Sequence, residues 1–209
     1  MDKLLLPGFG APARLYRRLL VPGWTVLEPP SFRSAGAGLR SYRAWLEEEL
    51  RRRGDPVWLA GHSMGGALAV LAAADDPGRI AGLTLISPAG LPLRKPVAAS
   101  AADLVRQVAG GRYRAGDAAW ALAQVLAAPR AAFALAREVR ALDLSAEMER
   151  IRRSGLPVEV VSCSTDTLVT PSQCRRQAAL LGARHRQLLL PGGHMWMLGR
   201  AEQLAAVLQ

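Results

Sequence analysis

A short turn sequence, Gly61-His62-Ser63-Met64-Gly65, separates two segments with different structural preferences. Residues 56–60 form an apolar run of strand length, whereas residues 67–74 are rich in alanine and leucine, which favour a helix. A Gly-x-Ser-x-Gly sequence between a strand and a helix is typical of a nucleophile elbow, in which the serine adopts a strained backbone conformation. We therefore predict that backbone passes too close to both glycines for a Cβ, and that the Ser63 hydroxyl lies above the sheet edge.

Strand-like and helix-like segments alternate around this turn. Short apolar runs predict strands at residues 3–6, 24–28, 57–60, 80–86, 158–162 and 186–190. Helical patterns cover residues 13–20, 39–53, 67–74, 171–181 and 200–208. In the second of these helices one face carries Leu39, Tyr42, Leu46 and Leu50. This alternation predicts an α/β fold with a roughly six-stranded, mainly parallel sheet and helices on both of its faces.

The alternation stops between residues 88 and 154. Helical patterns occur there near residues 98–109, 116–127, 129–142 and 145–153, and no strand-like run is found among them. An all-helical insertion into an α/β domain is most simply a cap. We predict a single domain over residues 1–209, in which residues 1–87 and 155–209 form the core and residues 88–154 the helical cap insertion.

The formal net charge is +10, from 27 Lys and Arg residues against 17 Asp and Glu residues. The basic residues are almost all arginines, spread along the predicted helices rather than interleaved with aromatic residues, so we expect no nucleic-acid partner. Of the ten arginines in the predicted cap, we single out six: Arg94, Arg106, Arg112, Arg114, Arg130 and Arg137. We interpret them as facing solvent, with contact to an anionic group of the substrate as the alternative.

No apolar run approaches the ~18 residues that a membrane-spanning helix needs, so we expect no membrane span. The first residues lack the pattern of a signal peptide. Cys163 and Cys174 are too few for a disulfide framework. We therefore expect a cytoplasmic protein. Nothing in the sequence predicts its oligomeric state.

A serine hydroxyl is a weak nucleophile at neutral pH and needs an adjacent base. The sequence holds three histidines, so the base is found by elimination. His62 lies beside the nucleophile in the turn, where we expect it to point away from Ser63, and His185 begins a predicted strand. His194 follows the last predicted strand, in a loop at the same edge of a parallel sheet as Ser63. His194 is therefore the predicted base, and a structural loop histidine is the alternative.

The base in turn needs a carboxylate that fixes its tautomer and stabilises its cation. After the strand predicted at 80–86 no acid occurs before Asp103, whereas Asp166 closely follows the strand predicted at 158–162. Asp166 is therefore the predicted orienting acid. The alternative role, capping the helix predicted at 171–181, is disfavoured because the spacing is too long for an N-cap.

Backbone N–H groups must also stabilise the oxyanion that develops during acyl transfer. One predicted donor is the amide of Met64, which directly follows the nucleophile at the start of a helix. The other is the amide of Phe9. Gly8 and Gly10 let the backbone of this loop approach the developing oxyanion closely. An ordinary glycine-rich turn is the alternative for this loop.

Together these residues resemble the α/β-hydrolase superfamily, over nearly the whole chain. The resemblance is carried by residues 7–10 after the first predicted strand, residues 61–66 at the elbow, Asp166, and the Gly-Gly-His sequence that ends at His194. Within the superfamily the chain looks most like the small carboxylesterases. The resemblance implies the α/β-hydrolase fold, with the N-terminal antiparallel hairpin of its eight-stranded sheet absent here. Pro7-Gly8 stands where many relatives have His-Gly.

The family mechanism implies an acyl-enzyme. Ser63 attacks an acyl carbonyl, His194 takes its proton, and water then hydrolyses the acyl-enzyme. The resemblance implies neither a metal nor an organic cofactor, and the sequence has no His and Cys cluster at ligand spacing.

An apolar wall beside the nucleophile is predicted from four residues: Phe9, Met64, Met195 and Trp196. For Met195 and Trp196, core packing under the last helix is an equally weighted alternative. The main hypothesis is a serine hydrolase that cleaves a small-molecule carboxylic ester. The alternatives are a thioesterase, a C–C bond hydrolase or lyase of the same fold, or a non-catalytic binding protein. No motif identifies the natural substrate or its acyl chain.

Overall fold

The computed structural model describes all residues except 18–22, 37, 94, 97–98, 100–101 and 103–114. Six strands form one sheet in the order β2-β1-β3-β4-β5-β6, and every pair of neighbours is parallel. The strands are β1 (Lys3–Leu6), β2 (Trp24–Val26), β3 (Val57–His62), β4 (Ile80–Ile86), β5 (Val158–Cys163) and β6 (Arg184–Leu188). The predicted six-stranded parallel sheet is confirmed.

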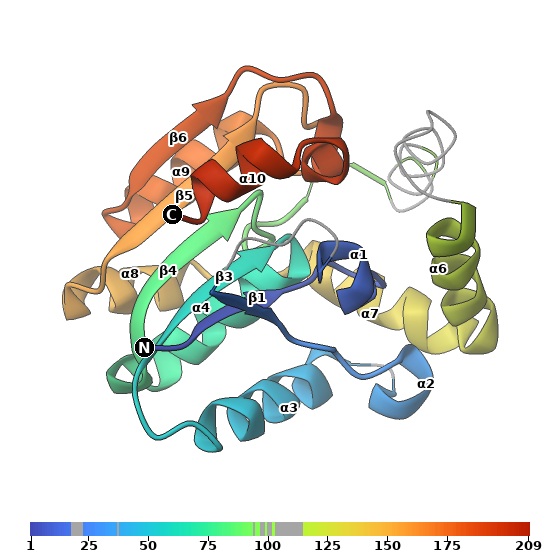
Figure 1. The fold of residues 1–209 in the computed structure, drawn as a ribbon, viewed down its shortest axis with the longest axis horizontal. Coiled ribbons are helices and arrows are strands. Elements are labelled where there is room, and N and C mark those ends of the chain that lie inside the picture. Colours follow the sequence, from blue (N-terminus) through green and yellow to red (C-terminus); the bar gives the residue numbers. More distant parts are fainter. Residues whose placement is uncertain (18–22, 37, 94, 97–98, 100–101, 103–114) are drawn as a thin grey trace.

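Helices cover both faces of this sheet (Figure 1). One face packs against α3 (Leu39–Arg51), α4 (Met64–Asp75), α8 (Ser145–Ser154) and α9 (Pro171–Leu181). The other packs against α1 (Ala13–Arg17), the 3₁₀ helix η3 (Gly193–Gly199) and α10 (Ala201–Val207). The predicted two-sided coverage of the sheet is therefore confirmed.

Alternating strand residues divide the core into two layers. Leu4 and Leu6 of β1 face the α4 side, whereas Leu5 between them faces the α1 side. In β4, Leu85 and Ile86 are divided in the same way. This is the period of two that a β-strand imposes on its side chains. Because both faces are covered, the central strands β1, β3 and β4 are mostly apolar along their length, whereas the edge strand β6 is polar.

Local signals in the sequence explain where several helices begin and end. Thr170 caps α9 and forms a capping box with Gln173, and Gly182 ends the helix at a φ of 63°. Gly155 ends α8 in the same left-handed conformation, with a φ of 73°. The predicted face of α3 is buried: Leu39, Tyr42, Leu46 and Leu50.

Between β4 and β5 the structure describes α6 (Ala115–Ala127), α7 (Pro129–Ala141) and α8. The helix predicted near 98–109 falls almost entirely outside the described residues, as do residues 18–20 of the helix predicted at 13–20. Met148 and Ile151 of α8 belong to the same core cluster as α4 and α9. The division into core and cap stays a prediction.

Three short helical segments that the sequence analysis did not predict are α2 (Phe32–Ala35), η1 (Pro77–Arg79) and η3. Pro29 and Pro30 favour a loop before the first of them, yet Ser31 provides an N-cap by accepting a hydrogen bond from the amide of Ser34. A serine directly after two prolines was the signal that could have located it.

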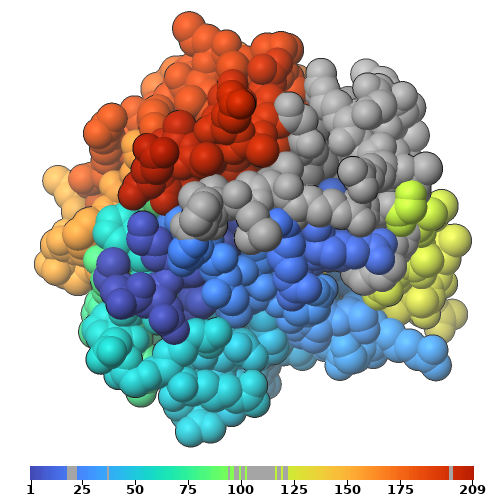
Figure 2. Space-filling view, in the orientation of Figure 1, coloured from blue at the N-terminus to red at the C-terminus, as the bar shows by residue number. Residues whose placement is uncertain are grey.

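The N-terminal and C-terminal segments meet on the α10 side of the molecule. Figure 2 shows the C-terminal segments, in red, above the N-terminal segments, in blue. The indole Nε1 of Trp24 donates a hydrogen bond to the carbonyl of Leu208 at 2.8 Å. Within the described residues, no helix has both the length and the apolar character needed to cross a membrane.

Candidate active site

The elbow has the strained geometry that the sequence predicts. Ser63 joins β3 to α4 with a φ of 54° and a ψ of −118°, a conformation rarely adopted by residues other than glycine. A Cβ on Gly61 would lie 2.4 Å from the carbonyl oxygen of Gly65. A Cβ on Gly65 would lie 2.4 Å from the carbonyl oxygen of Leu6 in β1. Both positions therefore require glycine, and the start of α4 lies directly against the first strand.

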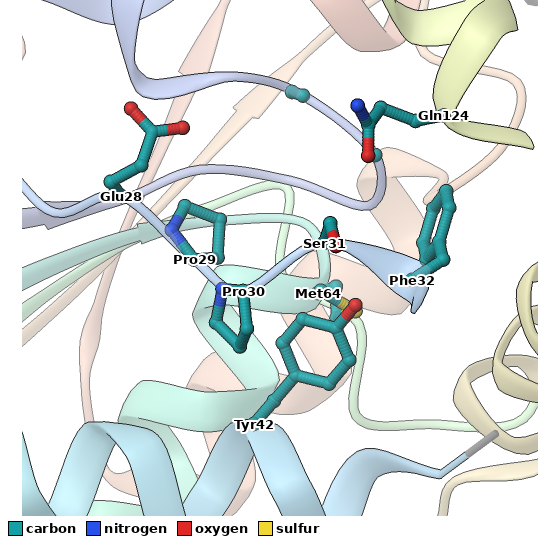
Figure 3. A pocket seen from close by; sticks show the side chains of 10 residues that line it. Glu28, Pro29, Pro30, Ser31, Phe32, Tyr42, Met64 and Gln124 are labelled. Carbon is teal, nitrogen blue, oxygen red and sulfur yellow. The ribbon is translucent and has the colours of Figure 1, made fainter. Parts of the chain in front are cut away.

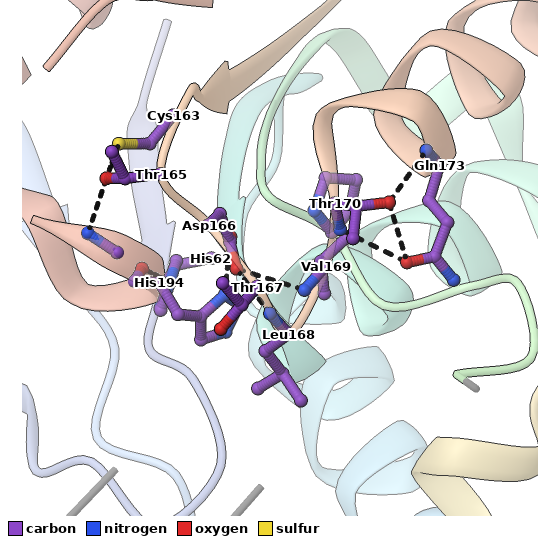
Figure 4. Close-up of polar contacts among 12 residues, drawn as sticks. His62, Cys163, Thr165, Asp166, Thr167, Leu168, Val169, Thr170, Gln173 and His194 are labelled. Carbon is purple, nitrogen blue, oxygen red and sulfur yellow. Dashed lines mark hydrogen bonds and ion pairs between the residues drawn. The ribbon is translucent and has the colours of Figure 1, made fainter. Parts of the chain in front are cut away.

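The predicted acid and base are hydrogen-bonded to each other (Figure 4). Nδ1 of His194 donates to Oδ2 of Asp166 at 2.8 Å, and both side chains are buried. The other carboxylate oxygen, Oδ1, accepts hydrogen bonds from the amides of Leu168 and Val169 at 2.9 and 3.0 Å. Asp166 therefore has a fixed orientation, with one oxygen bound to the backbone and the other directed at the imidazole.

The environment of Asp166 favours its ionised form. Burial alone would raise the pKa of this carboxyl, but the attraction of His194 and the hydrogen bonds from His194 and from the Leu168 amide outweigh it. The pKa of Asp166 is therefore below its usual value. An ionised Asp166 is the form that accepts the proton of His194 Nδ1 and stabilises an imidazolium.

The opposite ring nitrogen of His194 is not engaged. Its Nε2 is buried and has no hydrogen-bond partner among the described residues. The loop that carries His194 is anchored by Thr165, whose hydroxyl accepts from the amide of Gly193 and donates to the carbonyl of Leu190, both at 3.0 Å. With Nδ1 bound to Asp166, Nε2 is the nitrogen that remains for proton transfer.

The two predicted oxyanion donors are backbone amides, one in the elbow itself and one in the loop after β1. Met64 is the first residue of α4, and the first amides of a helix have no acceptor within it. In the loop after β1, the amide of Gly8 donates to the Tyr16 hydroxyl and that of Ala11 donates to the Gly8 carbonyl. Within the described part of the chain the amide of Phe9 has no acceptor, so it is available to a ligand.

His62, which the search for a base set aside, is buried at the centre of the site. Its Nδ1 lies 2.7 Å from the hydroxyl of Tyr16, and its Nε2 lies 3.1 Å from the carbonyl oxygen of His194. Burial, together with repulsion from His194, lowers the pKa of His62 to about 3. The ring is therefore neutral at physiological pH. Sequence reasoning missed this contact because it depends on the return of the His194 loop to the elbow.

This buried neutral histidine predicts a specific pH dependence of stability. In the unfolded chain His62 titrates near its ordinary value of about 6.5, so between about pH 6.5 and 3 the unfolded state binds the additional proton. The contribution of neutral His62 is complete above about pH 6.5 and decreases as the pH falls. Relative to His62→Gln, the free energy of unfolding of the natural chain should decrease more steeply, by up to about 1.4 kcal/mol per pH unit. Urea titrations from pH 7.5 to 4 measure both slopes, and equal slopes would contradict a neutral His62.

Met195 and Trp196 lie in the hydrophobic core. Both are buried in η3 and belong to the apolar cluster that includes Leu204 and Val207 of α10. Trp196 is 1% exposed, so no part of its face is open to a ligand. Their location favours core packing, the alternative that the sequence analysis left open, over contact with a substrate.

A cavity of about 260 Å³ lies beside the elbow, lined in part by Met64 (Figure 3). Most of its apolar wall comes from Pro29 and Pro30, which follow β2, and from Phe32, the first residue of α2. Phe32 in turn stacks on Phe9, with ring centroids 4.8 Å apart. Tyr42 of α3 also lines the cavity, and burial raises its pKa to about 12, so the hydroxyl stays protonated. The sequence analysis did not assign this wall to the site.

Two further expectations from the sequence concern metal ions and the arginines of the predicted cap. Among the described residues, no three His, Cys, Asp or Glu side chains are grouped as a metal site would need. Of the six cap arginines singled out in the sequence analysis, Arg130 and Arg137 are described, and both are exposed. The other four lie outside the described residues.

Comparison with known protein families identifies the fold family. Residues 4–207 match the model described as the alpha/beta hydrolase family. The chain belongs to this family. The match covers almost the whole chain and confirms the superfamily that the elbow and the predicted site residues resemble. Membership of the alpha/beta hydrolases supports a hydrolase, although the fold alone does not determine which bond is cleaved.

Individual relatives of this alpha/beta hydrolase are similar over limited segments or in fold alone. Monoglyceride lipase from Homo sapiens is 66% identical over 35 residues, which are 17% of this chain and 12% of the lipase. The enol-lactonase from Burkholderia xenovorans LB400 is 18% identical, with a TM-score of 0.75 over 98% of this chain and 88% of that chain. The thioesterase domain from the curacin biosynthetic pathway is 20% identical, with a TM-score of 0.67 over 99% of this chain and 90% of that domain.

Proposed function

We propose that this alpha/beta hydrolase cleaves carboxylic esters through an acyl-enzyme, with Ser63 as nucleophile, His194 as base and Asp166 as orienting acid. The observation that carries the proposal is the 2.8 Å hydrogen bond between His194 Nδ1 and Asp166 Oδ2, combined with a buried Nε2 that has no partner in the described structure. An imidazole held in this way accepts a proton at Nε2. The strained turn at Ser63 occurs at the same sheet edge.

In the proposed reaction Ser63 Oγ attacks the acyl carbon while its proton passes to His194 Nε2. The amides of Phe9 and Met64 stabilise the oxyanion, and the loss of one such donor typically costs about 3–4 kcal/mol. The imidazolium then gives its proton to the departing alcohol, which leaves the acyl group on Ser63. A water molecule, deprotonated by Nε2, hydrolyses the acyl-enzyme and restores the free serine.

The cavity beside Met64 is the proposed acyl pocket. Its volume of about 260 Å³ is below the ~300–1,000 Å³ of typical small-molecule sites, which favours a short acyl group. Pro29, Pro30 and Phe32 provide a rigid apolar wall, because proline and aromatic side chains lose little conformational freedom when a ligand binds. The Tyr42 hydroxyl is the proposed polar group for orienting the substrate.

A substrate panel tests the reaction and the pocket together. We expect p-nitrophenyl acetate and butyrate to be hydrolysed with a kcat/KM at least roughly tenfold above that of the laurate ester. An S-acyl thioester of the same acyl chain is measured in parallel, because the same catalytic groups serve either bond. A larger kcat/KM for the thioester would replace the ester proposal with a thioesterase. A preference for laurate would instead show that the acyl chain binds elsewhere.

A further inference from the structure

We infer that Tyr16 and His62 are positioning residues for the base, acting through a buried chain of hydrogen bonds from the oxyanion loop to the backbone of His194. This chain, named here the Tyr16–His62 relay, consists of the Gly8 amide, the Tyr16 hydroxyl, the His62 ring and the His194 carbonyl. The inference rests on the proposed function, because it assigns a role to residues that surround the proposed base.

The direction of every bond in the relay follows from its last member. A carbonyl oxygen accepts hydrogen bonds, so the contact of 3.1 Å requires His62 Nε2 to donate to His194. In a neutral imidazole the other nitrogen, Nδ1, is then an acceptor, and Tyr16 must donate to it at 2.7 Å. The hydroxyl oxygen still has a lone pair, which accepts the Gly8 amide at 3.2 Å.

Burial explains why these bonds would hold their geometry. Tyr16 and His62 are 2% and 1% exposed, so water does not replace a bond that breaks. Burial also raises the pKa of the Tyr16 hydroxyl. The hydroxyl therefore stays protonated and can donate its hydrogen bond to His62. The space is tightly filled, since a Cβ on Gly8 would lie 2.8 Å from His62 Nδ1.

The relay acts on the base rather than on the substrate. Both nitrogens of His62 are engaged, so its ring has no free site for proton transfer. Its ring centroid is 4.7 Å from that of His194, so it also limits the space in which the base can rotate. Thr165 fixes the preceding residue, Gly193, and the relay fixes the carbonyl of His194 itself. Together with the bond from Nδ1 to Asp166, the two anchors determine where Nε2 points.

Tyr16→Phe is the primary test, because it removes one hydroxyl and leaves the ring in place. We expect kcat for p-nitrophenyl butyrate to fall about 5- to 50-fold, with KM within about twofold, since misplacement of a catalytic group by 1 Å can cost about 10²-fold in rate. Rates are expressed per active site, counted with a fluorophosphonate. A misfolded fraction would lower the active-site count but not the rate per site.

Variants of His62 test the mechanism of positioning. Gln places an amide near the position of imidazole Nε2, so His62→Gln should retain the bond to the His194 carbonyl and lose less kcat than His62→Leu. Because both residues act in one chain, Tyr16→Phe combined with His62→Leu should be no slower than His62→Leu alone. His185→Leu is the control, since His185 bonds to Ser162 within the sheet, and it should leave kcat unchanged.

The results separate this inference from the proposed function. A natural chain that neither hydrolyses the esters nor reacts with the fluorophosphonate overturns the proposed function and the inference with it. A natural chain that does both, with an unchanged rate per site in Tyr16→Phe, overturns the inference alone. Equal losses for His62→Gln and His62→Leu, or multiplying losses in the double variant, also overturn it.

Discussion

Ser63→Ala is expected to lower kcat for a p-nitrophenyl ester by about 10⁴–10⁶ and to abolish labelling by a fluorophosphonate. The substitution removes the atom that would become acylated, whereas the oxyanion donors and the pocket stay in place. A residual rate above that of water alone is therefore expected from binding and oxyanion stabilisation. Steady-state kinetics and gel-based labelling measure the two effects independently.

Ser172→Ala is the matched control for Ser63→Ala. Ser172 is an exposed residue of α9, and its replacement should leave both kcat and labelling unchanged. A Ser63→Ala protein that keeps most of its esterase activity would contradict the mechanism. If the folded natural chain fails to react with the fluorophosphonate, or if labelling persists after Ser63→Ala, a non-catalytic binding protein becomes the better interpretation.

Asp166→Asn is expected to lower kcat by about 10³–10⁴, through the tautomer of the base rather than through charge alone. Oδ1 accepts two backbone amides, so the carbonyl oxygen of an asparagine would stay there and its NH₂ group would face His194. Nδ1 of His194 would then have to accept a hydrogen bond. The ring proton would move to Nε2, which could no longer take the proton of Ser63.

The comparison for this variant is Asp55→Asn, at an exposed acid remote from the site, which should leave kcat unchanged. Nitrogen NMR of His194 would report the tautomer directly, with the proton on Nδ1 in the natural chain and on Nε2 in Asp166→Asn. A variant that loses less than tenfold in kcat would rule out Asp166 as the orienting acid.

Much of this arrangement could be predicted from the sequence because it depends on local signals. The elbow requires two glycines, a serine, a preceding strand and a following helix, and all of these are contiguous in the chain. Asp166 and His194 could be placed because parallel strands bring the loops that follow them to one sheet edge. The 2.8 Å contact between these two side chains is what that topology led us to expect.

Features that depend on three-dimensional packing could not be predicted in this way. His62 appeared uninformative because its partners, Tyr16 and the His194 carbonyl, are 46 and 132 residues away in the chain. Trp196 lies two residues after His194, yet the turns of η3 direct it into the core beneath α10. In both cases the fold of a distant segment determines the environment of the side chain.

The cavity wall and the hydrogen-bonded pair of Asp166 and His194 lie on different segments of the chain. Pro29 and Pro30 come from the connection after β2 and Phe32 begins α2, whereas Asp166 and His194 follow β5 and β6. Met64 is shared between the cavity and the elbow. If the proposed roles hold, mutations in the β2 connection can accumulate without altering the groups proposed to transfer protons. The proposed acyl pocket would then give the chain a route to new substrates, in evolution or in directed evolution, from a small set of positions.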